Sequence, residues 1–317
     1  MRTIPLFIST RTAPLAVALG LAALAASCGA EEPPSSGQDG ASPKSEPLEV
    51  VATTMQLQDF TRQVGGPRVK VTGILGPDSE PHEYEPTPSD ADAVSESRVV
   101  VENGANLDEW LDDLLAGAGA KSLRVNASKG IELLPTEEEG FPGDPHVWHD
   151  PDGAKTMVDN VAAGLTAADP AGRSSFERGA ATYKEEIDRM AAEIRSTFRP
   201  IAPERRALVT SHDAFGYFAR AYDVDVVGSV LPSITTESEP SARRVRELVD
   251  EIRARRVRTI FTEEAVDPRL ERQVADEAGA EVSTSLYADV LGEPGSGAST
   301  FVEAELANAR AMAKAWR

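Results

Sequence analysis

Short apolar runs alternate with amphipathic segments along the chain from Leu48 onward. This alternation is typical of α/β units, in which a helix follows each buried strand, and it predicts mostly parallel sheets. The first set of runs predicts strands at 48–54, 69–75, 97–103 and 122–127, with helices at 56–65, 88–96 and 106–117. The second set predicts strands at 206–211, 224–230, 257–263 and 280–286, with helices at 213–221, 240–255, 267–278 and 299–315. We therefore expect two α/β lobes.

One long amphipathic segment, residues 171–200, separates the two sets. Its apolar residues recur at spacings of three and four, which marks one face of a helix that Pro200 and Pro203 end. At 1.5 Å per residue, about 27 residues give a length of roughly 40 Å. Such a helix either belongs to the core of one lobe or spans both as a stiff strut that limits their hinging. The expected division is an N-terminal lobe at 48–170, a connecting helix at 171–200 and a C-terminal lobe at 201–317.

The first 27 residues have the three parts of a secretory signal peptide, namely a basic start, an apolar core and a small-residue end. The small residues lead directly to Cys28. This ending resembles the bacterial lipobox, in which the cysteine becomes the lipidated first residue of the mature protein. We expect lipidation at Cys28 and an extracytoplasmic protein anchored to the bacterial cell membrane, with an ordinary secretory signal as the alternative. Residues 28–47 are rich in Gly, Pro, Ser and acids and are expected to form a flexible tether.

Cys28 is the single cysteine of the chain, so the globular part has no thiol for a metal site or a disulfide. Any metal site must therefore use imidazole and oxygen ligands, which disfavours thiolate zinc sites and iron–sulfur centres. Removal of the signal peptide leaves 30 basic and 52 acidic residues, a net charge of −22. We expect no nucleic-acid binding, because that binding rests largely on contacts between basic side chains and phosphates.

Three of the four histidines stand at or after the ends of predicted strands. His82 lies in the Pro-rich stretch GPDSEPHEYEP, His146 follows the acidic stretch TEEEGFPGD, and His212 lies in LVTSHDAF, where a strand ends and a helix begins. Loops at the carboxyl ends of strands commonly carry the ligand-binding residues of α/β proteins. Imidazole is the commonest metal ligand. The three histidines are therefore either solvated loop residues or, if they lie together, a cation site.

A carboxylate would complete a tetrahedral site of imidazole and oxygen ligands. Asp289 in SLYADVLG and Glu263 in IFTEEAVD both follow predicted strands of the second lobe, and position alone does not choose between them. The sequence has no HExxH, no Gly-rich phosphate loop and no GxSxG turn. Ser211 beside His212 does not predict a hydrolase, because neighbours on a strand point apart and no orienting acid is evident. No catalytic residue is expected.

Five segments, in order, resemble the cluster A-I solute-binding proteins of ABC transporters, which capture zinc or manganese outside the cytoplasmic membrane. The segments are PDSEPHEYEPTPSD (77–90), DPHVWHDP (144–151), TSHDAFGYFARAY (210–222), ESEPSARRVRELVDEIRARRVRTIFTE (237–263) and LYADVLG (286–292). The resemblance covers nearly the whole chain from Leu48 to Arg317. It implies two α/β lobes joined by a single long helix, with the metal in the cleft between them.

The resemblance also implies the metal ligands, motif by motif. His82 of the PHxYEP segment and His146 of the DPHxW segment would come from the first lobe. His212 of the SHDAF segment and Asp289 of the YxDxLG segment would come from the second. Four protein ligands saturate a tetrahedral ion and leave no position for an activated water, so we expect a binding protein and not an enzyme. The implied function is capture of Zn²⁺ and its delivery to a cognate ABC permease.

Ligand chemistry bears on the identity of the metal. Imidazole-rich sites suit zinc and oxygen-rich sites suit manganese, and members of the family with histidine in the third position are usually associated with zinc. Many zinc members carry a long His-rich loop before the second ligand, whereas residues 136–144 contain no histidine. We expect Zn²⁺, with Mn²⁺ as the alternative, and a monomer. A lipoprotein adhesin with a structural metal and a metal-dependent hydrolase are the competing functions.

His149 departs from the family's DPHxWxDP motif, in which this position is more often apolar. A helical turn from 146 to 149 would place both imidazoles on one face. Pro145 and Pro151 favour an extended or turn conformation instead, in which the two residues need not converge. We therefore expect His149, like Glu263, to lie beside the four ligands or at the entrance of the site, and not to bind the metal.

Overall fold

The structure is a computed structural model that describes residues 46–236 and 240–317. The expected signal peptide, the expected lipidation site Cys28 and nearly all of the expected tether at 28–47 lie outside the described residues. Within the described ranges, no helix combines the length and the apolar character needed to cross a membrane.

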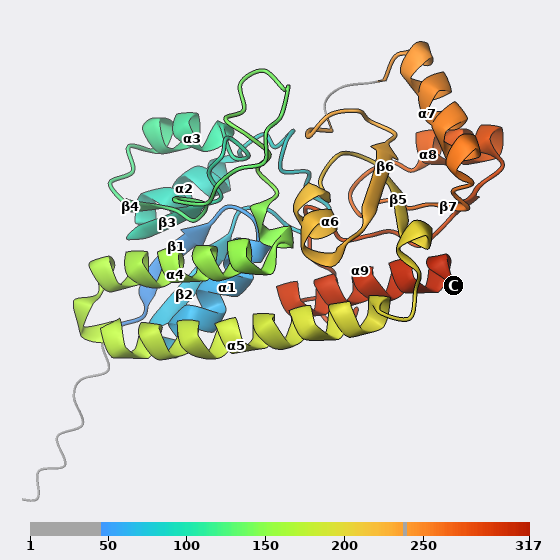
Figure 1. Ribbon diagram of the computed structural model, residues 1–317. Coiled ribbons are helices and arrows are strands. Elements are labelled where there is room, and N and C mark those ends of the chain that lie inside the picture. Colours follow the sequence, from blue (N-terminus) through green and yellow to red (C-terminus); the bar gives the residue numbers. More distant parts are fainter. Residues whose placement is uncertain (1–45, 237–239) are drawn as a thin grey trace, which may run out of the picture. The chain divides into compact units, whose positions relative to one another are not determined.

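The N-terminal lobe is built on a four-stranded parallel sheet in the order β2-β1-β3-β4 (Figure 1). Side chains alternate between its two faces, so that Val51 and Val100 pack toward α2 and α3, while Val50 and Val99 pack toward α1 and α4. Burial on both faces explains why the central strands are continuous apolar runs. The elements are β1 (Leu48–Ala52), α1 (Met55–Gly65), β2 (Val69–Gly73), α2 (Pro88–Glu96), β3 (Val99–Glu102), α3 (Trp110–Ala118), β4 (Leu123–Asn126) and α4 (Pro151–Ala168).

Helix α4 is absent from the helices expected above, and its start explains why. Pro151 occupies the first helical turn, where its missing N–H costs nothing, and the Asp150 side chain caps the helix by accepting from the Asp152 backbone N–H at 2.9 Å. Pro151 therefore begins a helix and does not belong to an extended segment. Gly153, Gly164 and several alanines weaken the apolar contrast along α4 that would otherwise reveal its period.

The C-terminal lobe contains two parallel strand pairs, β5-β6 and β7-β8. The Phe261 N–H donates to the Val209 carbonyl at 2.9 Å and joins the two pairs. Strands β7 and β8 are shorter than the expected 257–263 and 280–286, because the chain leaves the sheet early and makes only one further parallel bridge, between Glu263 and Leu286. The elements are β5 (Ala207–Thr210), α6 (Gly216–Tyr222), β6 (Asp225–Ser229), α7 (Ala242–Arg255), β7 (Thr259–Ile260), α8 (Arg269–Ala278), β8 (Glu281–Val282) and α9 (Phe301–Trp316).

Helix α5 (Arg173–Phe198) runs along the base of both lobes (Figure 1). It packs against α1 and α4 of the first lobe and against α6 and α9 of the second. One continuous hydrophobic core includes residues of α5 and of both lobes. The expected fold class, two lobes with parallel sheets joined by one long helix, is confirmed. The buried face of α5 consists of Phe176, Ala180, Tyr183, Ile187, Met190, Ala191, Ile194 and Phe198. The chain also forms four short 3-10 helices in the part that the structure describes, η1 (Gly66–Arg68), η2 (Val147–His149), η3 (Pro170–Gly172) and η4 (Pro203–Arg205).

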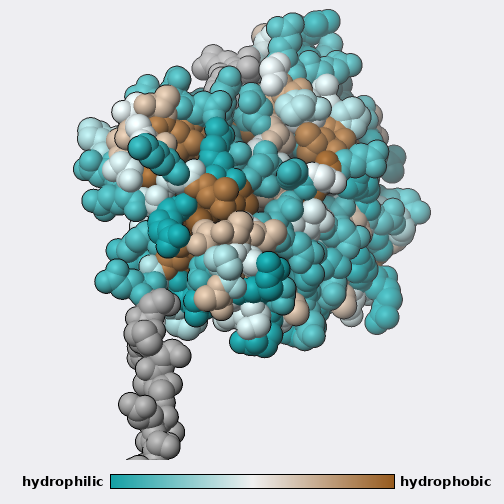
Figure 2. All heavy atoms as spheres, turned by 90° about the vertical axis from the view of Figure 1, so that its left-hand side faces the viewer, coloured by the Kyte–Doolittle hydropathy of each residue, from teal (hydrophilic) through white to brown (hydrophobic). Residues whose placement is uncertain are grey.

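The surface at the N-terminal-lobe end of the protein is mostly hydrophilic. Figure 2 shows hydrophilic side chains over most of this face, with smaller hydrophobic areas near its middle and toward its upper left and upper right. Among the described residues, Leu123 is the one large hydrophobic side chain that is exposed, at 41%. Such a surface agrees with the strongly acidic composition and with a core that takes up nearly all large apolar side chains.

Candidate metal centre

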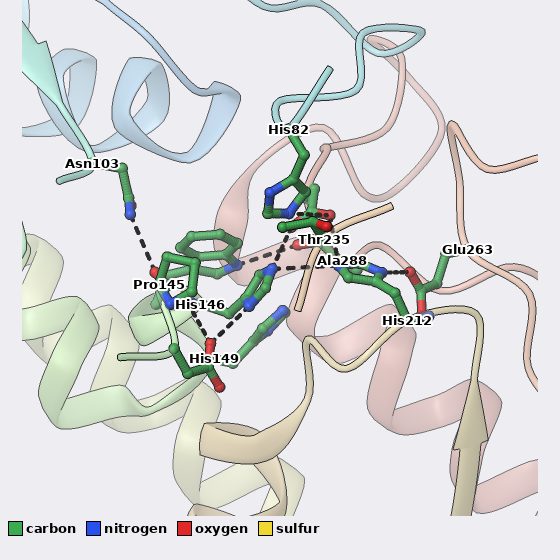
Figure 3. Close-up of polar contacts among 12 residues, drawn as sticks. His82, Asn103, Pro145, His146, His149, His212, Thr235, Glu263 and Ala288 are labelled. Carbon is green, nitrogen blue, oxygen red and sulfur yellow. Dashed lines mark hydrogen bonds and ion pairs between the residues drawn. The ribbon is translucent and has the colours of Figure 1, made fainter. Parts of the chain in front are cut away.

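Three histidines and an aspartate meet where the two lobes join (Figure 3). His82 lies in the loop after β2, and His146 lies in the loop after β4. His212 follows the end of β5 by two residues, and Asp289 lies in the loop after β8. The strands of each sheet are parallel, so the loops at their carboxyl ends gather at one edge. Both lobes turn that edge toward the same point.

The four side chains are close together and almost completely buried. The Nε2 atom of His212 lies 3.1 Å from Oδ2 of Asp289, and the Nε2 atom of His146 lies 3.3 Å from its Oδ1. The Nε2 atom of His82 is 3.8 Å from Oδ2. The four ligand atoms all lie within 4.8 Å of one another, and no side chain of the group is more than 4% exposed.

These separations suit a single small cation. A tetrahedral zinc ion with bonds of about 2.0–2.1 Å places its ligand atoms roughly 3.4 Å apart. The contacts between Asp289 and the three imidazoles bracket that value. The donor set is three nitrogens and one carboxylate, and it contains no thiolate.

Carboxylates orient two of the imidazoles from behind. The Nδ1 atom of His146 is 2.7 Å from Oδ1 of Asp144, and the Nδ1 atom of His212 is 2.5 Å from Oε2 of Glu263. A carboxylate accepts from Nδ1–H, which leaves the Nε2 lone pair free to bind a metal. Glu263 also accepts from the backbone N–H groups of Ser211 at 2.9 Å and His212 at 3.2 Å. Glu263 therefore holds His212 in place, while Asp289 faces the three histidines.

Comparison with known proteins identifies the family of the chain. A family model described as the zinc-uptake complex component A, periplasmic (ZnuA), matches residues 50–315. The chain belongs to this family. Manganese-binding lipoprotein MntA of Halalkalibacterium halodurans is 32% identical to it over 288 residues, which cover 90% of this chain and 92% of that protein. Manganese ABC transporter substrate-binding lipoprotein PsaA of Streptococcus anginosus is 28% identical over 289 residues, with coverage of 89% and 90%.

The solved structures agree as well. The periplasmic zinc binding protein TroA from Treponema pallidum matches with a TM-score of 0.80 at 29% identity, covering 86% of this chain and 99% of that one. A structure of ZnuA matches with a TM-score of 0.76 at 26% identity, covering 86% and 100%. As a ZnuA-family member, the protein is a metal-binding component of an ABC transporter and not an enzyme.

His82 differs from the other two histidines of this ZnuA-family site. Neither of its ring nitrogens has a hydrogen-bond partner among the described residues, although both are buried. Burial lowers the pKa of His82 to about 3, against the opposing effect of Asp289, so the imidazole is neutral. A buried imidazole without a partner is costly. A cation bound at Nε2 would satisfy one of the two nitrogens.

The other three side chains carry charge in the metal-free protein. Burial disfavours protonation of His146, but the carboxylates of Asp289 and Asp144 outweigh it and raise its pKa to about 9. Burial likewise opposes protonation of His212, and Glu263 and Asp289 raise its pKa well above the ordinary value. The pKa of Asp289 is held well below its ordinary value, because His212 and His146 outweigh burial. Protons therefore occupy the place that a cation would take.

His149 lies outside the group of four. Its Nδ1 atom is 2.7 Å from Oε1 of Glu305 in α9. The side chains of His149 and Glu263 are almost completely buried, and the residues are 1% and 2% exposed, so a place at an entrance is wrong for both. The expected extended or turn conformation is wrong here: residues 147–149 form a short 3-10 helix, which the His149 N–H closes by donating to the His146 carbonyl at 3.3 Å.

Two acids that the sequence motifs did not single out precede histidines of the site. The stretches EPH and DPH each place an acid two residues before a histidine, and in both the carboxylate accepts from that histidine's N–H, Glu80 at 3.1 Å and Asp144 at 2.9 Å. Burial, reinforced by Asp289, raises the pKa of Glu80 to about 8. The repeated acid–Pro–His spacing was the available signal, because an acidic side chain at a turn commonly accepts from a backbone N–H two residues on.

Proposed function

We propose that the protein captures Zn²⁺ outside the cytoplasmic membrane and delivers it to an ABC permease. His82, His146 and His212 supply imidazole nitrogen, and Asp289 supplies carboxylate oxygen. The observation that carries the proposal is the spacing of 3.1–3.8 Å between the Asp289 oxygens and the three Nε2 atoms. Two ligands come from each lobe, so the bound ion joins the lobes.

The ligand count supports capture without chemistry on the metal. Catalytic zinc sites keep one position for water, which the metal activates. Here four protein donors fill a tetrahedral shell. The carboxylates of Asp144 and Glu263 are each hydrogen-bonded to an imidazole and serve its orientation. A cargo site of this kind gains affinity from a complete shell and has no need of an open position.

Manganese is the second candidate, and a specific observation favours it. The curated relatives MntA and PsaA are named for manganese, whereas TroA is named for zinc. Three imidazoles and one carboxylate suit zinc better than manganese, which prefers oxygen ligands. We therefore place Zn²⁺ first.

We further propose that the mature protein is a monomer tethered to the membrane through a lipid on Cys28. The relatives MntA and PsaA are named as lipoproteins. A tether of about 20 residues would let the metal site reach a permease in the same membrane. Mass spectrometry of the membrane-extracted protein tests the lipid, and a Cys28→Ser variant should be released from the membrane.

The biological metal is the one that is bound to the protein when it is isolated from cells. Most nitrogen and oxygen sites bind zinc more tightly than manganese, so competition in vitro favours zinc whatever the biological cargo. Elemental analysis should therefore use protein isolated from cells supplied with both metals. We expect one equivalent of zinc in the wild type and little in Asp289→Ala. One equivalent of manganese would establish the second candidate. Protein that carries neither metal would contradict both candidates.

A further inference from the structure

The segment that carries His146 belongs to the N-terminal lobe but is bonded to the C-terminal lobe on both sides of the histidine. Before it, the Asp144 carbonyl accepts from the hydroxyl of Tyr217 in α6 at 2.8 Å. After it, the Trp148 indole N–H donates to the Ala288 carbonyl at 3.2 Å, one residue from Asp289. Both contacts place C-terminal-lobe groups directly beside the N-terminal lobe's second ligand.

His149 extends this contact farther into the C-terminal lobe. Its Nδ1 atom lies 2.7 Å from Oε1 of Glu305. Its ring stacks on Phe215, with ring centroids 4.7 Å apart and an interplanar angle of 25°. Phe215 follows His212 by three residues, and all three side chains of this contact are buried. One side chain thus contacts both α9 and the segment that carries the third ligand.

The turn that joins His146 to His149 is tightly packed, so the position of one residue constrains the position of the other. The backbone bond from the His149 N–H to the His146 carbonyl closes it. Val147 and Trp148 between them are 0% and 1% exposed. The first turn of α4 packs directly against it, since a Cβ atom at Gly153 would lie 2.2 Å from the Val147 carbonyl oxygen. The backbone between His146 and His149 is therefore closed by a hydrogen bond and packed against α4.

The pair is poorly suited to a purely stabilising role. Nε2 of His149 and Oε2 of Glu305 are buried without a hydrogen-bond partner in the described part of the chain. Unsatisfied buried polar atoms cost free energy that offsets much of what the single hydrogen bond contributes. A nonpolar pair of similar volume would serve stability at least as well. The feature that a nonpolar pair lacks is a directional bond between the lobes.

We propose that His149 and Glu305 form a cross-lobe anchor that sets the position of His146 relative to His212 and Asp289 before the metal arrives. The inference rests on the proposed function, since it concerns the same metal site. His149 is a positioning residue and not a ligand. Ligands that are already in place lose less conformational freedom when the ion binds, so the anchor raises metal affinity.

The anchor is tested by removing each partner. His149→Leu, Glu305→Leu and the double variant are stripped of metal and titrated with Zn²⁺ in competition with a chelator. The absorption spectrum of bound Co²⁺ reports the geometry of the site. Each single variant should bind Zn²⁺ roughly tenfold more weakly, within the range seen when groups outside the ligand shell are removed. The double variant should lose no more than either single, because the anchor is already broken. His149→Asn places an amide N–H where Nδ1 of His149 lies and should restore most of the affinity and the Co²⁺ spectrum.

Tyr183→Phe is the matched control, because it deletes another buried side-chain bond, 2.6 Å from Asp59, that holds α5 to α1. It should lower thermal stability and leave Zn²⁺ affinity and the Co²⁺ spectrum unchanged. If His149→Leu does not fold, His149→Ser takes its place, since serine is polar but too short to reach Glu305. Wild-type affinity with an unchanged Co²⁺ spectrum in either single variant, or additive losses in the double, would overturn the anchor. A wild type that binds no metal would contradict the proposed function instead.

Discussion

The Nε2 atoms of His146 and His212 lie 3.3 Å apart, although 66 residues separate the two histidines in the chain. Each ring is oriented by a carboxylate of its own lobe, Asp144 for His146 and Glu263 for His212. Both Nε2 atoms also face the Asp289 carboxylate, at 3.3 Å and 3.1 Å. Each lobe therefore supplies an imidazole whose Nε2 already faces the metal site, and joining the lobes completes the site.

Removal of a ligand should cost far more affinity than removal of His149. His146→Ala deletes one of four donors and should weaken Zn²⁺ binding by more than the 10–100-fold typical of groups outside the ligand shell. His149→Ala should weaken it by roughly tenfold. Chelator competition measures both. Equally large losses would mean that His149 binds the metal directly.

Glu263→Gln should weaken Zn²⁺ binding by roughly 10–100-fold. An amide has one accepting oxygen, so it cannot serve the His212 ring and both backbone N–H groups as the carboxylate does. It also removes the charge that strengthens His212 as a ligand. Glu264→Gln, at the exposed neighbouring position, is the control and should bind as the wild type does. Equal affinity in the two variants would refute a role for Glu263.

Zn²⁺ binding should release protons, and affinity should rise with pH up to about 9. The metal needs a neutral imidazole, whereas Asp289 and Asp144, against the opposing effect of burial, raise the pKa of His146 in the metal-free protein to about 9. Each proton displaced makes the affinity change by about tenfold per pH unit. His82, with a pKa of about 3, should release none. Calorimetry in buffers of different ionisation enthalpy counts the protons. A flat affinity from pH 6.5 to 9 is incompatible with these pKa shifts.

The metal-free protein should lose stability over the same range. The pKa of His146 is raised above its ordinary value of 6.5, so its ion pairs stabilise the fold fully below about pH 6.5, and this contribution is lost as pH rises through about 9. A bound cation replaces the protons and should abolish the loss. Thermal unfolding with and without Zn²⁺ measures both, and His146→Gln should remove the contribution. If the midpoint temperature of unfolding falls equally with rising pH whether or not Zn²⁺ is bound, the loss of stability comes from other groups.

The placement of three histidines at strand ends could be predicted because it depends on local pattern. Apolar runs fix the strands, and parallel β/α units bring the following loops to one edge, so His82 and His212 were placed from their neighbours alone. Local pattern did not choose between Asp289 and Glu263, because both follow strands of the same lobe. The choice depends on which carboxylate faces the histidines, and this is set by the loops beyond β7 and β8.

Features that join distant parts of the chain could not be predicted. The bond between His149 and Glu305 spans 156 residues, and neither position has a neighbour that reveals the other. The start of α4 at Pro151 is not evident from local pattern, because proline is compatible both with an extended segment and with the first turn of a helix. Packing of α4 against α1 and α5 decides between them.

Anomalous X-ray diffraction from crystals of the zinc-loaded protein, recorded on both sides of the zinc absorption edge, tests the central claim most directly. We predict a single peak bonded to Nε2 of His82, His146 and His212 and to an oxygen of Asp289, at about 2.0–2.1 Å. A peak at any other place, or one that lacks a ligand from either lobe, would contradict it.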